Sequence, residues 1–534
     1  MPPSTKIFTK LGLFPGTDNQ VTSSNAKQSR SESVVSVNPT NTNNLIAASK
    51  KFIDPLIYHF TIGVSYSFNG GGSWTESSLT PLQGSDGMTD PALAFDNLGN
   101  AFLVAEPWRY VVRNGVKDLE GMGMYVYKSA DGGQTWSAPG VLHPSDIKDD
   151  KQWIVSDLNP GSPFYGNIYV CWAASAPLRF SRSTNHGNSW KGIGNSASGT
   201  AITVGNAFAP EITVGNDGVI HIVWHMPGTG EIRYMRSTNG GDSFTPETVA
   251  VTGVSSLTGH LPFTNGWPHF PNATFRVLTL ATGCAVEGNR FIVAWADYRE
   301  NVSRIYYRIT DTNGNWTGSG SGQPLLPNYQ GSGLHHFHPQ IISTGSGVVG
   351  CAFYEFGLKQ GGYRIDVMIA ASFTNGASFD YVKKVTDQPW DPKVNAPLSH
   401  GDPNVTFIGE YFGLDASSDA FALVWTDTRT GVQELFFDWV HTEKFELPDE
   451  FRGIYAKIIF GVIQDGGGLI IVGGKPIPIP PHGPAYDILN ALAALDAVKA
   501  IGHRSSFEIQ RSLLASIEAI AKDAAKNLRI KDRH

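Results

Sequence analysis

The sequence predicts an all-β protein: a seven-bladed β-propeller, followed by a small C-terminal module of one β-hairpin and two helices. Two observations predict the propeller. A turn pattern of Ser, a small or acidic residue, Gly, Ser/Thr and an aromatic recurs with a period of roughly 60 residues, which is typical of repeat architectures. Pairs of short apolar runs bounded by turn residues alternate with these copies, as expected for small sheets arranged around an axis.

The clearest copy of the repeated turn spans residues 129–136, Ser-Ala-Asp-Gly-Gly-Gln-Thr-Trp. An acidic or amide side chain can accept hydrogen bonds from amides of its own turn, and glycine supplies the positive φ. The aromatic residue fills the gap between neighbouring sheets. We therefore expect these turns to hold the sheets together rather than to carry chemistry. The other copies span residues 67–74, 183–190, 237–244 and 372–379, with a shorter one at 310–316.

This turn resembles the Asp-box of the sialidase (BNR-repeat) superfamily, and the resemblance covers about residues 20 to 440. It implies a β-propeller that binds or cleaves glycans, because the superfamily includes hydrolases, lectins and proteins with neither role. Sialidases use a tyrosine nucleophile with a glutamate, an aspartate acid/base and an arginine triad. The Phe/Tyr-Arg-Ile-Pro motif of the first sialidase arginine is absent here, and the nearest strings begin at Tyr307 and Tyr363.

Seven strand pairs support seven blades, since pairs begin near residues 34, 90, 153, 210, 278, 339 and 408. A six-bladed ring, usual in sialidases, is the alternative and requires one pair to be an insertion. The last unit ends after its third strand, and an open edge invites association with other chains. We therefore predict that residues 19–23 supply the missing strand and close the ring.

The expected domains are an N-terminal tail at 1–18, the propeller at 19–444 and the C-terminal module at 445–534. In the module, apolar runs at 454–463 and 469–479 predict the hairpin. Apolar stripes over 488–498 and 513–528 predict the two helices. Such a small core needs a partner, so the module either docks on the propeller or forms a homo-oligomer through its helices.

Composition excludes several function classes. The net charge is −7 without a sustained basic run, which argues against nucleic acid as a partner. No run of 18 apolar residues is present, so we expect no membrane span. No secretion signal is recognisable, which favours a cytoplasmic protein or one exported without a Sec signal. The three cysteines lie in apolar runs and are expected to be buried free thiols, and we predict neither a cofactor nor a metal site.

Chain direction places the expected ligand site on the face opposite the repeated turns, at the loops entering strand one and those joining strands two and three. Carboxylates and a tyrosine on these loops are candidate catalytic residues: Glu211, Asp150, Glu410 and Tyr411. Arginines that could hold an anion, and aromatic groups that could stack on sugars, are candidate ligand-binding residues: Arg109, Trp108, Trp153, His225, His338, Arg299 and Arg429.

Some of these residues have structural alternatives. Arg299 and Arg429 each end the same Trp-x-Asp-x-Arg spacing, and a repeated pattern favours a structural ion pair. The histidines around His338 lie in an extended segment whose alternate side chains point apart, which argues against a metal cluster. Glu410 and Tyr411 are neighbours, so on a strand they would face opposite sides.

Three hypotheses for function follow. The first is recognition of a glycan or small carbohydrate on the face opposite the repeated turns. The second is a glycoside hydrolase or other glycan-cleaving enzyme that uses the carboxylates named above. The third is a structural head of a larger assembly, joined through the C-terminal helices.

Overall fold

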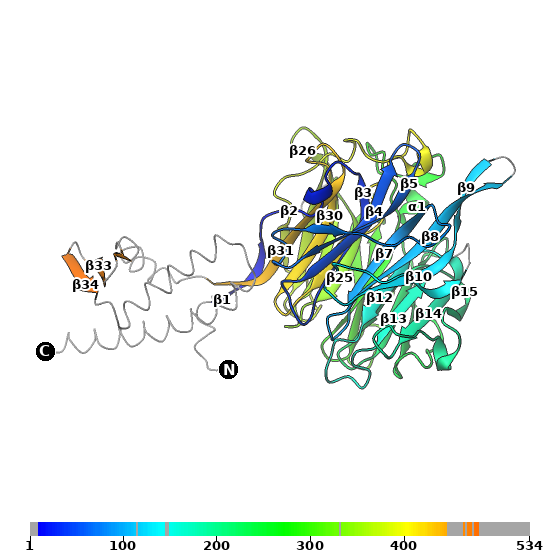
Figure 1. The fold of residues 1–534 in the computed structure, drawn as a ribbon, viewed down its shortest axis with the longest axis horizontal. Helices are drawn as coiled ribbons and strands as arrows, with labels where there is room; N and C mark the ends of the chain where they lie inside the picture. The colour runs from blue at the N-terminus through cyan, green and yellow to red at the C-terminus, as the bar shows by residue number, and fades with distance from the viewer. Residues whose placement is uncertain are drawn as a thin grey trace. The chain divides into compact units, whose positions relative to one another are not determined.

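The computed structural model describes residues 9–113, 116–144, 149–329 and 333–445, together with three short segments at 463–464, 467–472 and 475–479. The chain divides into two compact units, Leu13–Thr442 and the remainder. The larger unit is nearly all-β, and its described residues contain one short α-helix, α1 (Leu257–His260). Its many antiparallel sheets are consistent with a propeller-like fold (Figure 1).

The first two sheets are built from strands that follow one another in the chain. The first contains β3 (Arg30–Val37), β4 (Leu45–Asp54), β5 (His59–Ser67) and β6 (Thr75–Ser77). The second contains β7 (Gly87–Phe95), β8 (Ala101–Arg113), β10 (Gly123–Ser129) and β11 (Gly140–Pro144), with β9 (Val116–Gly121) paired to the end of β8.

A seven-stranded sheet follows, in which β14 pairs with β15. Its strands are β12 (Gln152–Ser156), β13 (Ile168–Trp172), β14 (Ala174–Ser183), β15 (Thr200–Val214), β16 (Ile220–Met226), β17 (Glu231–Ser237) and β18 (Thr248–Val251). A two-stranded ribbon comes next, made of β19 (Phe263–Thr264) and β20 (Trp267–Pro268).

Three more sheets complete the larger unit. The first contains β21 (Ala281–Val286), β22 (Arg290–Asp297), β23 (Arg304–Ile309) and β24 (Gln323–Pro324). The second contains β25 (His335–Ser343), β26 (Val349–Lys359), β27 (Gly362–Ser372) and β28 (Tyr381–Lys384). The last contains β29 (Gly413–Ala416), β30 (Ala420–Asp427) and β31 (Glu434–Phe445), with β1 (Thr9–Pro15) and β2 (Asn19–Gln20) paired to β31.

The N-terminal segment supplies the outer strand of this last sheet. Asn19 of β2 lies opposite Phe437 of β31, and Gln20 lies opposite Phe436. The predicted pairing of the residues near 19–23 with the last unit is therefore confirmed for these two positions. The pairing covers the backbone groups of β31 that would otherwise form an open edge.

The repeated turn at 129–136 connects its own sheet to the preceding one. Ser129 Oγ donates to Asp131 Oδ1 (2.7 Å) and accepts from the Gly133 amide (2.9 Å). Gly133 has a φ of 97°, and a Cβ there would lie 2.5 Å from Cγ2 of Ile46 in the first sheet. Trp136 Nε1 donates to Ser77 Oγ, also in the first sheet (3.0 Å). These contacts fit the structural role expected of the turns.

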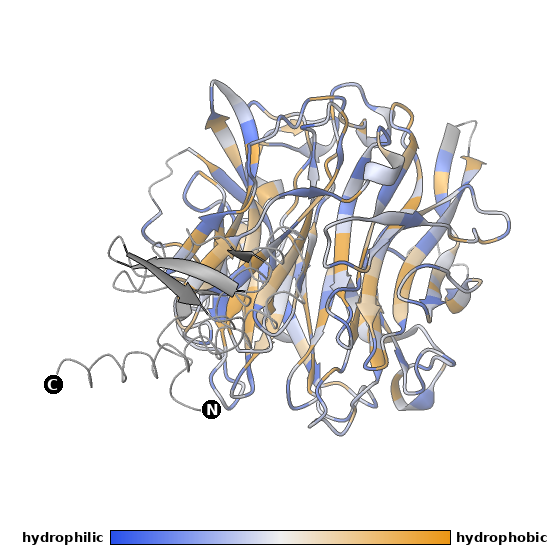
Figure 2. Ribbon diagram, turned by 60° about the vertical axis from the view of Figure 1, so that its left-hand side comes forward, coloured by the Kyte–Doolittle hydropathy of each residue, from blue (hydrophilic) through white to orange (hydrophobic). Residues whose placement is uncertain are grey.

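The core consists of apolar side chains packed between neighbouring sheets. Figure 2 shows apolar residues concentrated along the strands and polar residues in the connecting loops. Four tryptophans near the ends of second strands are fully buried: Trp172, Trp224, Trp295 and Trp425. The predicted burial of the cysteines is confirmed, and all three are free thiols: Cys171, Cys284 and Cys351. No helix in the described part of the chain has the length and apolar character needed to cross a membrane.

The described C-terminal segments differ from the hairpin that the sequence predicts. The run at 469–479 was expected to be one strand, but β33 (Gly467–Val472) and β34 (Lys475–Ile479) pair with each other, and β32 (Ile463–Gln464) pairs with β33. The sequence has Gly-Gly between β33 and β34, which favours a tight hairpin connection. The predicted helices lie outside the described residues.

Candidate functional site

A backbone irregularity recurs in four strands. In β3, β7, β15 and β25, two residues face one residue of the next strand, which defines a β-bulge. The first bulged residue has a positive φ in each strand: 54° at Glu32, 51° at Asp90, 46° at Ala209 and 47° at His338. Lys151, immediately before β12, has a φ of 48°. This conformation is uncommon and strained for residues other than glycine, and it concentrates at functional sites.

Charged groups gather around these bulges, and we call them the ionic cluster. Its members are Glu32, Lys50, Asp90, Glu106, Asp150, Lys151, Glu211, Arg276, His338, Glu410 and Tyr411. In the first sheet the repeated turn begins at Ser67, opposite Leu45 at the start of β4, whereas Lys50 lies opposite Ser31 toward the other end. The cluster and the repeated turn therefore occupy opposite ends of this sheet.

Lys50 connects the bulges of the first two sheets. Its Nζ lies 2.7 Å from Glu32 Oε2 and 3.6 Å from Asp90 Oδ1, and it also lies 4.6 Å from the centroid of the Phe60 ring. Burial and the Asp90 charge raise the pKa of Glu32 to about 8. Burial acts against ionisation of Asp90, but Lys50 and hydrogen bonds with neighbouring carboxyl groups outweigh it, so the pKa of Asp90 falls below its usual range.

Three carboxyl groups meet beside Lys50. One oxygen each of Asp90, Glu106 and Asp150 lies within 4.8 Å of the other two. Glu106 lies on β8 opposite Thr89, and Asp150 precedes β12 in the next repeat. Burial and the negative charge of the neighbouring carboxylates raise the pKa values of Glu106 and Asp150 well above their usual range.

Tyr411 lies against Lys151. The tyrosine is 2% exposed, and its hydroxyl has no hydrogen-bond partner among the residues that the structure describes. Lys151 Nζ lies 3.8 Å from the centroid of the Tyr411 ring and 4.6 Å from that of Trp153. Burial raises the pKa of Tyr411 well above its usual range and lowers that of Lys151.

Glu211 is held by the neighbouring sheet. Its Oε1 accepts hydrogen bonds from Thr282 Oγ1 (2.8 Å) and from the Gly283 amide (3.0 Å), both on β21. Burial outweighs these hydrogen bonds and the Lys151 charge, and it raises the pKa of Glu211 to about 7. Glu211 can therefore exchange a proton near neutral pH.

Arg276 and Glu410 form an ion pair on the other side of the cluster. Arg276 Nε lies 3.0 Å from Glu410 Oε1. The guanidinium carbon lies 4.1 Å from the ring centroid of Trp267 and 4.2 Å from that of Phe407. His338 is buried with neither ring nitrogen hydrogen-bonded within the described residues, and burial and the Arg276 charge lower its pKa to about 3.

The structure thus brings together six of the residues selected from the sequence: Glu211, Asp150, Glu410, Tyr411, Trp153 and His338. Glu410 and Tyr411 contact different groups, as expected for neighbours that do not pair with each other. The reason differs from the expectation, because Glu410 lies at a bend and not on a strand. Gly409, with a φ of 93°, directs the chain into this bend.

Three selected residues lie in other surroundings. Trp108 is buried in a core cluster, with its ring 5.1 Å from Phe60 and 4.9 Å from Tyr110, so it offers no open face for stacking on a sugar. Arg109 pairs with Glu120 (2.7 Å) where β8 meets β9. His225 is buried, which lowers its pKa to about 4.

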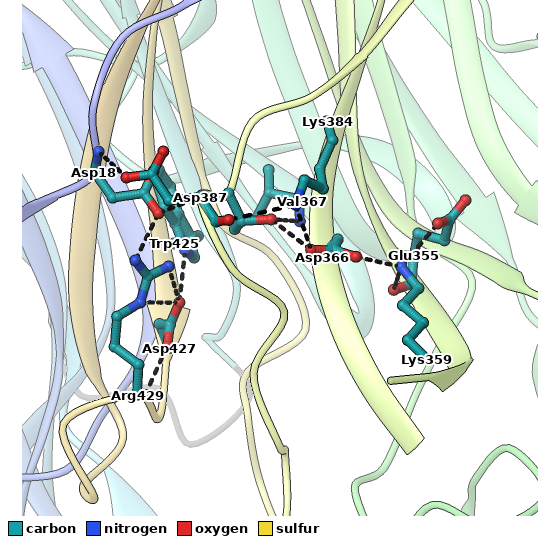
Figure 3. Close-up of polar contacts among 11 residues, drawn as sticks. Asp18, Glu355, Lys359, Asp366, Val367, Lys384, Asp387, Trp425, Asp427 and Arg429 are labelled. Atoms are coloured by element: carbon teal, nitrogen blue, oxygen red, sulfur yellow. Dashed lines mark hydrogen bonds and ion pairs between the residues drawn. The ribbon is translucent and has the colours of Figure 1, made fainter. Parts of the chain in front are cut away.

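The two remaining arginines form ion pairs within their own sheets. Arg429 Nη2 lies 2.6 Å from Asp427 Oδ2, and its Nη1 lies 2.7 Å from Asp18 Oδ2 (Figure 3). Arg299 contacts Asp297 in the same way, with Nε 2.8 Å from Oδ1. These contacts match the structural ion pair that the repeated Trp-x-Asp-x-Arg spacing favours.

The histidines around His338 do not share a set of ligand atoms. The ring of His335 stacks on Phe270 with a centroid distance of 4.3 Å. His336 Nε2 lies 3.0 Å from Glu355 Oε2. With His338 in the ionic cluster, the three rings have separate surroundings, which agrees with the expectation from an extended segment.

Sequence analysis did not select four members of the cluster: Glu32, Lys50, Lys151 and Arg276. A proline directly follows Asp90, Ala209 and His338, and this recurrent dipeptide at the start of a strand was a usable signal for the bulges. Arg276 lies between β20 and β21, in a segment whose pattern shows no repeat.

No protein-family model and no curated protein matches the chain. Among solved structures, a protein of unknown function from Dyadobacter fermentans is 15% identical, with a TM-score of 0.42 over 67% of this chain and 98% of that chain. A leech intramolecular trans-sialidase is 12% identical, with a TM-score of 0.39 over 64% of this chain and 67% of its own. The GH93 α-L-arabinofuranosidase of Fusarium graminearum is 12% identical, with a TM-score of 0.35, and the match covers 68% of this chain and 96% of that chain. All three TM-scores are below 0.5, so these similarities assign no function to the chain. The functional argument therefore rests on the ionic cluster.

Proposed function

We propose that the chain binds a glycan at the ionic cluster and cleaves a glycosidic bond there. The observation that carries the proposal is the buried Tyr411, whose hydroxyl has no hydrogen-bond partner in the described part of the chain and whose ring lies under the Lys151 ammonium. Buried polar groups without partners are rare in folded proteins, and a bound substrate would supply the missing partner. Strained bulges and strongly shifted pKa values in the same place are typical of catalytic sites.

Cleavage of a glycosidic bond needs a proton donor for the leaving oxygen and a second group for the anomeric carbon. Glu211, with a pKa of about 7, is suited to the first role because its proton is retained near neutral pH. Tyr411 is suited to the second role. Its raised pKa keeps the phenol protonated in the free protein, so as its oxygen bonds to the anomeric carbon the proton would pass to the ionised carboxylate of Asp90. The Lys151 ammonium over the ring would stabilise the negative charge that develops on the phenol oxygen. Lys151 interacts with both Glu211 and Tyr411, so its positive charge acts on the proton donor and on the tyrosine together.

The substrate is proposed to be a glycan without a carboxylate. Arg276 is the one arginine in the ionic cluster, and its partner is Glu410 at 3.0 Å. An arginine triad able to hold a sialic acid carboxylate is therefore not formed by the cluster. Recognition of a glycan without cleavage is a second candidate function. It fits the single, paired arginine of the cluster, because a lectin for a neutral glycan needs no group of arginines to bind a carboxylate.

The proposal is tested by measuring release of 4-methylumbelliferone from a panel of α- and β-glycosides, including a sialoside. Release from a neutral glycoside, and its loss in Tyr411→Phe and Glu211→Gln, is the expected result. Glu287→Gln, which changes an exposed glutamate, is the matched control and should retain activity. Saturable binding on a glycan array without turnover of any glycoside would favour recognition alone. Absence of both binding and turnover would exclude both candidates.

We also propose that the repeats form seven blades. The seven-stranded sheet then counts as two blades, which meet where Ala174 of β14 lies opposite Phe208 of β15. Support comes from the bulge in β15, which repeats those in β3, β7 and β25 and so marks β15 as the first strand of its own repeat. An experimental structure of the full chain, in which blades are counted around the axis, tests this assignment.

A further inference from the structure

We propose that Asp90, Glu106 and Asp150 form a binding site for one Ca²⁺ ion. The site lies between two neighbouring repeats, because Asp90 and Glu106 belong to the β7–β8 sheet and Asp150 precedes β12. This inference concerns ion binding alone, and it does not depend on whether the chain cleaves glycans.

The spacing of the carboxylates suits calcium. One oxygen from each residue lies within 4.8 Å of the other two. Ca²⁺ binds oxygen at about 2.3–2.6 Å, so two ligands on opposite sides of one ion lie about 5 Å apart. Mg²⁺, the other hard ion to consider, binds oxygen at about 2.0–2.1 Å and requires near-ideal octahedral geometry. An all-oxygen set without histidine or cysteine favours these hard ions over zinc or copper.

Glu106 is the residue that most needs a partner. It is 7% exposed, and it makes no hydrogen bond or ion pair with any of the residues that the structure describes. A buried carboxylate without a counter-ion is costly, since it loses hydration and gains nothing in return. Its carboxylate oxygen lies in the same small volume as those of Asp90 and Asp150, so a cation placed there would contact all three.

The nearby lysines do not pair with Glu106. Lys50 is closer to Glu32 (2.7 Å) than to Asp90 (3.6 Å). Lys151 lies over the rings of Tyr411 and Trp153. Neither ammonium group is paired with Glu106.

Gln152, two residues after Asp150, adds an independent indication. Gln152 is 1% exposed, and its Nε2 donates to the backbone carbonyl of Asp90. Its Oε1 is buried without a partner among the described residues. Amide oxygens are common calcium ligands, so a cation bound next to Asp90 would also satisfy this side chain directly or through a water molecule.

The test is a calorimetric titration of the full chain with CaCl2, after treatment with a chelator and its removal. We expect one Ca²⁺ to bind per chain and to raise the melting temperature. No saturable binding at millimolar CaCl2 would overturn the proposal, and this result depends on no variant. Binding of Mg²⁺ with equal affinity would overturn the assignment to calcium.

Two variants locate the site. Glu106→Gln and Asp150→Asn should each weaken calcium binding at least tenfold, because each removes one charged ligand. Asp118→Asn is the control, since Asp118 lies in an exposed part of β9, and it should bind as the wild type does. Circular dichroism in calcium-free buffer checks that the variants fold. Wild-type affinity in a folded Glu106→Gln variant would place any bound ion elsewhere and overturn the proposal.

Discussion

The ammonium nitrogen of Lys151 lies 3.8 Å from the centroid of the Tyr411 ring. The two residues lie far apart in the sequence, and Lys151 has a left-handed backbone conformation, with a φ of 48°. A cation over an aromatic face is attracted to it, most strongly where water is excluded. The contact therefore helps to orient Tyr411 and places positive charge over its ring.

Replacing Tyr411 by Phe should abolish glycan cleavage without destabilising the fold. The change removes a buried hydroxyl that has no partner among the described residues, so the free energy of unfolding should stay equal or rise by up to about 1 kcal/mol. Turnover of the best glycoside should fall by about 100-fold or more if the hydroxyl reacts. Steady-state kinetics and urea denaturation measure the two quantities.

Tyr127→Phe is the matched control for this prediction. The Tyr127 hydroxyl donates to the Thr80 carbonyl (3.1 Å), so its loss should lower the free energy of unfolding by about 1 kcal/mol while turnover is retained. Full activity in Tyr411→Phe would exclude the tyrosine as a reacting group.

Glu211→Gln should change how stability depends on pH. The pKa of Glu211 rises from 4.5 in the unfolded chain to about 7 in the fold, so the folded protein binds this proton more tightly. Between these values the wild type loses stability as pH rises, by about 3 kcal/mol for this group. Glu211→Gln has no titratable group at this position, so its free energy of unfolding should fall less between pH 4.5 and 7 than that of the wild type.

Urea denaturation at several pH values from 4 to 8 tests this prediction. The quantity compared is the difference in the free energy of unfolding between wild type and variant at each pH. The other titratable groups that interact with Glu211 are Lys151, Cys171, Cys284 and Cys351. Burial raises the pKa values of the three thiols, so the thiols stay neutral between pH 4 and 8. Parallel curves for the two proteins would show that Glu211 does not hold a proton near neutral pH.

Arg429→Met should reduce stability and leave glycan binding intact. Asp427 is fully buried and has Arg429 as its ion-pair partner, so the variant leaves a buried carboxylate unpaired, at a cost of about 3 kcal/mol. Arg113→Met, which breaks an exposed pair with Asp118, is the control and should change little. Loss of binding in a folded Arg429→Met variant would instead support the ligand-binding role predicted from the sequence.

Gly71→Ala should destabilise the contact between the first sheet and the last. Gly71 has a φ of 89°, and a Cβ there would overlap the ring of Phe437 in β31. Gly84 has a similar φ of 84° but no atom within 4 Å of an added Cβ, so Gly84→Ala measures the backbone cost alone, about 1 kcal/mol. Gly71→Ala should cost at least about 2 kcal/mol more by thermal or urea denaturation. Equal losses in the two variants would show that the contact with Phe437 contributes nothing.

The sequence predicted the fold because its signals are local. The turn at 129–136 contains its own hydrogen-bond donors and acceptors, and each strand pair has its own apolar pattern. The pairing of β2 with β31 followed from counting strands in the last repeat. The hairpin within 467–479 was missed because a long apolar run hides a short turn.

The site was predicted less completely because it depends on contacts between repeats. Lys50 is one of two adjacent lysines in an otherwise mostly apolar strand, and only its place beside Glu32 and Asp90 explains why it is buried. Trp108 is of a residue type that often stacks on sugars, yet its ring packs against Phe60 in the core. Arg276 reaches Glu410 from a segment with no repeat pattern, so nothing in the sequence connects the two.

The shared bulge separates the chemistry of the site from the stability of the scaffold. The same backbone conformation carries a carboxylate at Asp90, an imidazole at His338 and a methyl group at Ala209. Side chains at this position can thus be exchanged during evolution while the strands and their pairing stay the same. Ala209 is the natural position at which to introduce a new functional group, and a protein engineer could begin there to change what the cluster binds.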